Sequence, residues 1–301
     1  MIIAKNAALF VNASGENDCV ASFLDAVSPT AIENSMLVAI DEQLPVYKML
    51  TNKHRKQRYE EIIKNANTNE LSALNDQLQS LNWLTSDAQR LTGHFPAALI
   101  DWMNQQAEVD LVVKQSVPCD GDYGNASKGD IKMIRQSSAP VLLLHAHVNK
   151  AAPVIAAIPP IGQDQSGLKL ANRVLTNAIN WAAALGAPIK IVRAWQLVGE
   201  HLLEMNVPAK EVEEALKEEQ EWAEHEMKTL IDNADIPDDI QYEVSIEKGN
   251  ATRVIHEKID GLSPSVVVLG AVARDGLSAT ILGSTAESVI RKKSTSVLVV
   301  K

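Results

Sequence analysis

The segment that decides the fold lies close to the end of the printed sequence, where residues 266–287 read VVVLGAVARDGLSATILGSTAE. The apolar run that ends at Gly270 is typical of a buried strand, and the glycine lets the backbone turn sharply. A second glycine, Gly283, stands directly before Ser284 and a run with helical spacing. Because the first N–H groups of a helix favour an anion, the segment predicts a strand, a loop and a helix that can hold phosphate.

Short apolar strands alternate with helical segments along the rest of the chain. Strands are predicted at residues 8–11, 36–40, 81–84, 111–113, 141–144, 153–158, 188–193, 240–246, 266–269 and 296–300. Strands that alternate with helices form parallel sheets covered on both faces. The expected fold class is therefore α/β, with two tandem open, mostly parallel five-stranded sheets and helices on both faces.

An internal repeat supports the division into two sheets. Sliding the chain against itself by 156 residues aligns Gly249 with Gly93 and Val297 with Val141, without a gap between residues 93 and 144. The 301 residues give about 150 for each copy, which is a common domain size. We therefore predict one domain at residues 1–147 and a second at 148–301.

Composition and charge exclude several classes of protein. The formal net charge of -10 argues against sequence-independent binding of nucleic acid. No apolar run approaches the roughly 18 to 20 residues that span a membrane, and the first residues lack the apolar core of a secretory signal. Two cysteines are too few for a disulfide framework or a cysteine-rich metal site. We expect a cytoplasmic protein with no metal and no membrane or nucleic-acid partner.

Motifs of common enzymes are absent from the sequence. There is no P-loop, no Gly-x-Gly-x-x-Gly run, no Gly-x-Ser-x-Gly elbow and no His-Glu-x-x-His pair. The sequence also places no histidine or carboxylate beside Ser284 as a partner for nucleophilic catalysis. The residues therefore indicate no enzyme, and weak hydrolysis of ATP would lack an identifiable base.

The loop after the 266–269 strand resembles that of the universal stress protein family. Nucleotide-binding members carry Gly, two residues, Gly, nine residues, Gly and then Ser or Thr, and this chain has Gly270-x2-Ala273-x9-Gly283-Ser284. The resemblance covers essentially the whole chain and is greatest to the tandem, two-domain branch of the family. It implies a non-enzymatic role in stress adaptation.

The resemblance also implies a ligand, ATP or a related adenine nucleotide, in the second domain. Two departures weaken this site, since the second glycine is Ala273 and the aspartate that usually follows the first strand is Pro159. A methyl group crowds the backbone where phosphate should approach, and the proline removes a carboxylate partner for the nucleoside. The resemblance assigns these residues to the site: Pro159, Val192, Gly270, Ala273, Arg274, Gly283, Ser284 and Thr285.

The first copy departs further from the family motif. Lys114 replaces Gly270, Ser127 replaces Gly283 and Lys128 replaces Ser284. The resemblance therefore predicts no nucleotide in the first domain.

Three functions of different classes remain open on the sequence alone. The first is nucleotide sensing by the second domain. The second is an interaction module, since family members dimerise through the last strand, here residues 296–300, which in a tandem chain can pair with its twin inside one molecule or in a homodimer. The third is a carrier of an apolar or amphipathic ligand, with Pro159 and Ala273 lining a less polar pocket.

Overall fold

The structure is a computed structural model of the 301-residue chain. It describes residues 2–12, 18–42, 85–116, 128–145, 148–162, 165–271, 282–292 and 295–301, together with single positions from 58 to 80.

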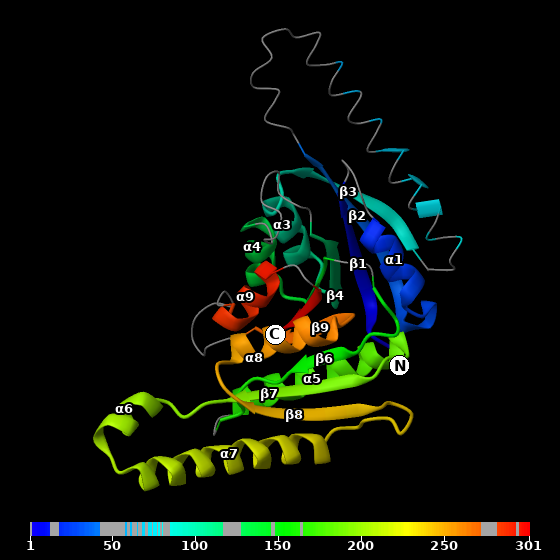
Figure 1. Cartoon of the computed structure of the whole chain (residues 1–301). Helices are drawn as coiled ribbons and strands as arrows, with labels where there is room; N and C mark the ends of the chain where they lie inside the picture. Colours follow the sequence, from blue (N-terminus) through cyan, green and yellow to red (C-terminus); the bar gives the residue numbers. More distant parts are fainter. Residues whose placement is uncertain are drawn as a thin grey trace, which may run out of the picture.

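Ten strands make up one continuous sheet, drawn in Figure 1. In chain order they are β1 (Ala4–Asn12), β2 (Ile32–Glu42), β3 (Thr85–Gly93), β4 (Leu111–Gln115), β5 (Val141–Leu144), β6 (Val154–Ala157), β7 (Ile189–Trp195), β8 (Tyr242–Lys248), β9 (Val266–Gly270) and β10 (Ser296–Val300). Their order across the sheet is β3-β2-β1-β4-β5-β10-β9-β6-β7-β8. Every neighbouring pair is parallel except β5 and β10, which are antiparallel.

The prediction of an α/β fold with mostly parallel strands is confirmed, but the prediction of two separate sheets is wrong. Val297 pairs with Leu143 and Val299 with Val141, so the last strands of the two halves join edge to edge. Both strands are buried along their whole length. Without this pairing, each of these apolar strands would be an exposed edge of its own sheet. The pairing buries both strands within one molecule. Each half keeps the same strand order, counted outward from this seam.

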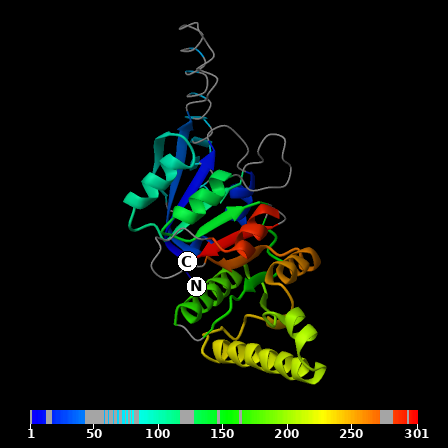
Figure 2. The ribbon, with the colours of Figure 1, turned by 90° about the vertical axis from the view of Figure 1, so that its left-hand side faces the viewer.

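Helices cover both faces of the sheet, as Figures 1 and 2 show. Their bounds are α1 (Asp18–Ala26), the 3-10 turn η1 (Pro29–Ala31), α3 (Ala97–Gln105), α4 (Lys128–Gln136), α5 (Gln165–Leu185), α6 (Glu200–Asn206), α7 (Ala209–Asp232), α8 (Ala251–Leu262) and α9 (Ser284–Lys292). Side chains of α1, α5 and α7 build the core on one face. Those of α3, α4, α8 and α9 build the core on the other.

Two elements differ from the sequence-based prediction. The third strand of the first half is β3, Thr85–Gly93, whereas the predicted strand at 81–84 lies outside the described residues. β3 is an edge strand with the polar sequence TSDAQRLTG, so it lacks the apolar pattern by which buried strands are found. The second difference is α6, which has no buried residue and therefore leaves no apolar stripe pointing to a core.

A glycine occupies the same unusual backbone conformation in each half. Gly93 ends β3, Gly249 follows β8, and both have a φ of 146°. Few residues other than glycine adopt this conformation, so both positions require one. In each half the chain turns here from the edge strand toward the helix that follows.

Candidate functional site

The carboxyl ends of four parallel strands meet at one edge of the second half of the sheet. Ala157 at the end of β6 lies opposite Val192 on one side and Leu269 on the other, and Gly270 lies opposite Val300. In open parallel sheets, ligands bind at this edge. The register therefore brings Gly270 and the residues that follow β6 to neighbouring positions.

Pro159 and Val192 are placed differently within this edge. Pro159 is partly exposed and follows β6 by two residues. Val192 lies within β7 with its side chain 1% exposed, and its carbonyl oxygen accepts the Ile158 N–H at 2.9 Å. Val192 thus reaches the edge through its backbone rather than its side chain.

Gly270 is required by a close contact with a helix. A Cβ atom at this position would lie 2.8 Å from the Cγ and Cδ2 atoms of Leu170 in α5. The glycine therefore admits the Leu170 side chain to the end of β9. This packing accounts for the glycine without a phosphate, and it places an apolar side chain beside the candidate site.

The start of α9 supplies the donors for an anion. The Gly283 carbonyl accepts the Glu287 N–H at 2.9 Å, so Gly283 caps the helix that begins at Ser284. Ser284 is exposed and Thr285 is partly exposed. The first N–H groups of a helix have no acceptor within the helix, and the helix dipole favours negative charge there. The predicted residues Ala273 and Arg274 lie outside the described part of the chain.

Helix α8 lies beside α9 and runs in the same direction. The Thr252 hydroxyl donates to the Thr285 hydroxyl at 3.2 Å, and one turn further His256 and Ser288 are 3.0 Å apart. Another turn on, Lys292 pairs with Asp260. Contacts at matching positions along both helices bring their N-termini to the same end, where the two dipoles reinforce each other.

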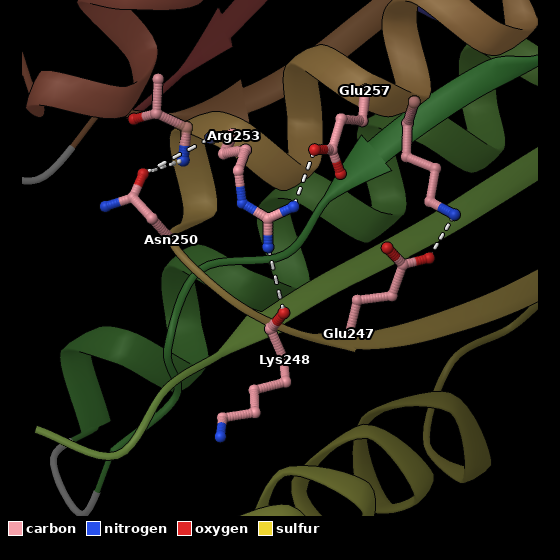
Figure 3. Close-up of polar contacts among 7 residues, drawn as sticks. Glu247, Lys248, Asn250, Arg253 and Glu257 are labelled. Atoms are coloured by element: carbon pink, nitrogen blue, oxygen red, sulfur yellow. Dashed lines mark hydrogen bonds and ion pairs between the residues drawn. The ribbon is translucent and has the colours of Figure 1, made fainter. Parts of the chain in front are cut away.

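The start of α8 is capped by its own chain, as Figure 3 shows. The Asn250 side-chain oxygen accepts the N–H groups of Thr252 at 3.0 Å and Arg253 at 3.4 Å. Arg253 in turn pairs with Glu257 and donates to the Lys248 carbonyl. An external anion at α8 would have to displace Asn250, so the start of α9 is the better candidate of the two.

A buried ion pair near the end of β7 was not predicted from the sequence. Arg193 and Glu226 approach to 3.1 Å, with side chains only 8% and 6% exposed. Glu226 also accepts the Trp222 indole N–H at 2.9 Å and the Gly162 N–H at 3.0 Å. The network fixes the loop after Pro159 to α7. One signal was present in the sequence, because Glu226 interrupts the apolar face of α7.

The first half fills the corresponding position with its own side chains. Lys114, which aligns with Gly270, lies 2.8 Å from Asp130, and the two side chains are 3% and 0% exposed. Its ammonium group also lies 4.6 Å from the centre of the Phe95 ring. Asp130 accepts the Ser116 hydroxyl at 2.9 Å. Lys128 begins α4, and Ser127 lies outside the described residues.

Metal clusters and membrane-spanning helices are both absent from the described residues. In that part of the chain, no three side chains of His, Cys, Asp or Glu are grouped so that they could hold a metal ion. None of its helices is both long and apolar enough to cross a membrane.

Comparison with known structures establishes the fold. A crystallised protein of Pseudomonas aeruginosa UCBPP-PA14, described as a candidate universal stress protein, aligns with 99% of this chain and 93% of its own length, with a TM-score of 0.72 and 20% identity. A universal stress protein from Archaeoglobus fulgidus DSM 4304 aligns over 98% of both chains, with a TM-score of 0.63 and 15% identity.

Comparison of sequences points to one family for the second half of the chain. Residues 161–301 match the model of the universal stress protein family. The match covers the second half of the chain, which is therefore similar to the universal stress protein family, and the predicted resemblance is confirmed. The curated relatives are named universal stress protein E; those of Salmonella typhi and Escherichia coli (strain K12) are 46% and 45% identical over 56 residues. That segment is 19% of this chain and spans only 18% of the length of either relative.

Proposed function

We propose that this chain is a non-enzymatic stress-adaptation protein of the cytoplasm, whose second domain binds the phosphate groups of an adenine nucleotide such as ATP. The domain would comprise residues 148–301, and residues 1–147 would form a companion domain that carries no nucleotide. The pairing of β5 with β10 would make the two domains a pseudo-dimer within one chain. The supporting observation is the arrangement of α8 and α9, whose starts lie together.

The proposed site would hold phosphate through hydrogen-bond donors at the start of α9. The N–H groups of Ser284 and Thr285 and the Ser284 hydroxyl are donors at the positive end of α9. Thr252, hydrogen-bonded to Thr285, adds a hydroxyl from α8. We infer binding rather than catalysis, because these residues supply donors and none of them is a general base.

Other features of the edge reduce its affinity for the nucleoside. Pro159 offers no carboxylate, and Leu170 covers Gly270 from the side of α5. We therefore expect the phosphate groups to contribute most of the binding free energy. An apolar or amphipathic ligand that contacts Leu170 and Pro159 is the alternative at the same edge.

Calorimetric titration of the full chain with ATP tests the proposal. A valine at Gly283 places a branched side chain where phosphate must approach, so Gly283→Val should abolish saturable heat. Gly261→Val is the matched control, because Gly261 lies in α8 and a Cβ atom added there would have open space within 4 Å. Binding by both the wild type and the control, but not by Gly283→Val, is the expected result.

Two results would count against this site. Unchanged ATP binding by Gly283→Val rejects the start of α9 as the phosphate site. No heat with any of the three proteins rejects nucleotide binding itself. The alternative function, an interaction module, would then be favoured by the exposed apolar side chains at α6. Leu202 and Met205 in this helix are 66% and 70% exposed, and Val198 just before it is 86% exposed. Exposed apolar side chains that lie close together in the sequence are of the kind that contacts another protein.

A further inference from the structure

A cavity lies at the junction of the two halves, beside the first and last turns of α9. It has a volume of about 410 Å³ and lies between α4 and α9, the helices that precede the paired strands β5 and β10. Figure 1 shows these two helices next to each other on the same face of the sheet. Its charged lining comes from Lys128, Lys132 and Arg135 of α4 and from Glu287 and Arg291 of α9.

Two equivalent arginines share one carboxylate in this cavity. Arg135 and Arg291 are 156 residues apart, which is the repeat offset, and each lies in the last turn of its helix. Arg135 Nη2 lies 2.7 Å from Glu287 Oε2, and Arg291 Nε lies 3.1 Å from Glu287 Oε1. The position equivalent to Glu287 in the first half is Ile131, so the pair of arginines has a single acidic partner.

The charges of the cavity do not balance. Lys128 and Lys132 form no ion pair with any described residue, so four cationic side chains face one carboxylate. This concentration of positive charge occurs in a chain with a formal net charge of -10. Hydrogen bonding from Arg291 lowers the pKa of Glu287 below its ordinary value, and the charge of Arg135 acts in the same direction. The cavity thus stabilises an anion inside it.

We propose that the cavity between α4 and α9 binds a small anion with two or more phosphate charges, held by Arg135 and Arg291 with the lysines of α4. The planar guanidinium group offers paired N–H donors that match the oxygens of phosphate. The volume is in the range of small-molecule sites. Glu287 occupies the arginines when no ligand is bound, so the incoming anion competes with it.

This site adjoins the proposed nucleotide site, because Glu287 lies in the first turn of α9, but it is built from other side chains. Ser284 and Arg291 are seven residues apart on α9, which corresponds to roughly 10 Å along the helix axis. The contacts of α8 with Thr285 and Ser288 lie on another side of α9 from those with Arg135. The inference therefore does not require that the nucleotide proposal hold.

Titration of the full chain with inorganic pyrophosphate at low ionic strength tests the proposal. Saturable binding by the wild type should weaken at least tenfold in Arg135→Gln. Glu287→Gln should bind several-fold more tightly, because the internal competitor is lost while both arginines stay charged. Lys292→Gln is the matched control, since this change removes one cation from α9 but Lys292 pairs with Asp260 outside the cavity. Its affinity should stay within twofold of the wild type.

Several results would overturn the proposal. One is the absence of saturable binding in both the wild type and Glu287→Gln. Another is an equal loss in Lys292→Gln and Arg135→Gln, which would reflect overall charge rather than a site. Loss of pyrophosphate binding in Gly283→Val would assign the anion to the start of α9 instead. Should Arg135→Gln fail to melt cooperatively, Lys128→Gln replaces it, because Lys128 is the exposed first residue of α4, and the same weakening is expected.

Discussion

Removing either charge of the buried pair Lys114 and Asp130 should destabilise the protein strongly. The two groups are 2.8 Å apart and essentially inaccessible to water. At an effective dielectric constant of 20, their attraction is about 6 kcal/mol. Desolvation opposes it by several kcal/mol for each ion, so the intact pair contributes little net stability. A single substitution leaves the other charge buried and uncompensated, which costs about 3–5 kcal/mol.

A double-mutant cycle measures this coupling. Asp130→Asn keeps an acceptor for Ser116 and leaves the Lys114 ammonium unpaired, whereas Lys114→Met leaves the carboxylate unpaired. We expect each to lower the free energy of unfolding in urea by about 3–5 kcal/mol. The double variant should lose at least about 2 kcal/mol less than the sum of the two, because it contains no unpaired charge.

The control for this cycle is an exposed pair on α7. Glu214→Gln breaks the contact with Lys210, where the side chains are 62% and 86% exposed and 3.7 Å apart. We expect a change below about 0.5 kcal/mol. Additive losses in the cycle, or a loss below about 1 kcal/mol for Asp130→Asn, would refute the reasoning that these charges depend on each other.

Two further predictions concern α8. Burial, with the nearby charge of Lys292, lowers the pKa of His256 below its ordinary value of 6.5, so the unfolded chain binds the proton more readily and stability should fall as the pH drops below about 6.5. His256→Gln keeps a partner for Ser288 and should show a flatter dependence of the urea midpoint between about pH 7 and 5.5; equal slopes would contradict the assignment to His256. Asn250→Ala should lose about 1 kcal/mol of unfolding free energy with the cap of α8. Asn250→Asp should retain most of it, and an equal loss in both would show that the cap contributes little.

The residues of the candidate site that could be predicted from the sequence lie next to a strand with a clear apolar pattern. Gly270, Gly283 and Ser284 were predicted because an apolar run, a glycine and a helix start are all visible within one short segment. The structure places Gly283 and Ser284 at the start of α9. It also gives Gly270 a packing role against Leu170, which is 100 residues distant in the sequence and could not be inferred from it.

The unpredicted parts depend on pairs that are distant in sequence. Arg193 and Glu226 come from different elements, and although Glu226 interrupts an apolar helix face, the sequence does not show that Arg193 is its partner. The strand β3 was missed because it lies at the edge of the sheet and pairs with β2 alone. A strand in that position can have a polar sequence, so no apolar pattern marks it. The periodic pattern of apolar residues indicates which side chains are buried. It does not show which distant residues pair with each other, and such pairs stabilise these parts of the structure.

The sequence by itself determined the α/β class and the alternation of strands and helices, because each buried strand is a local apolar run. The loop motif that begins at Gly270 gave the resemblance to a family. Only the tertiary structure decided that two five-stranded units form one sheet. The pairing of β5 with β10 joins edges more than 150 residues apart, and it brings Arg135 within hydrogen-bonding distance of Glu287, 152 residues away. These contacts form because the edge strands of the two halves are apolar and are removed from water when they pair. The sequence of either strand alone does not specify which strand it pairs with.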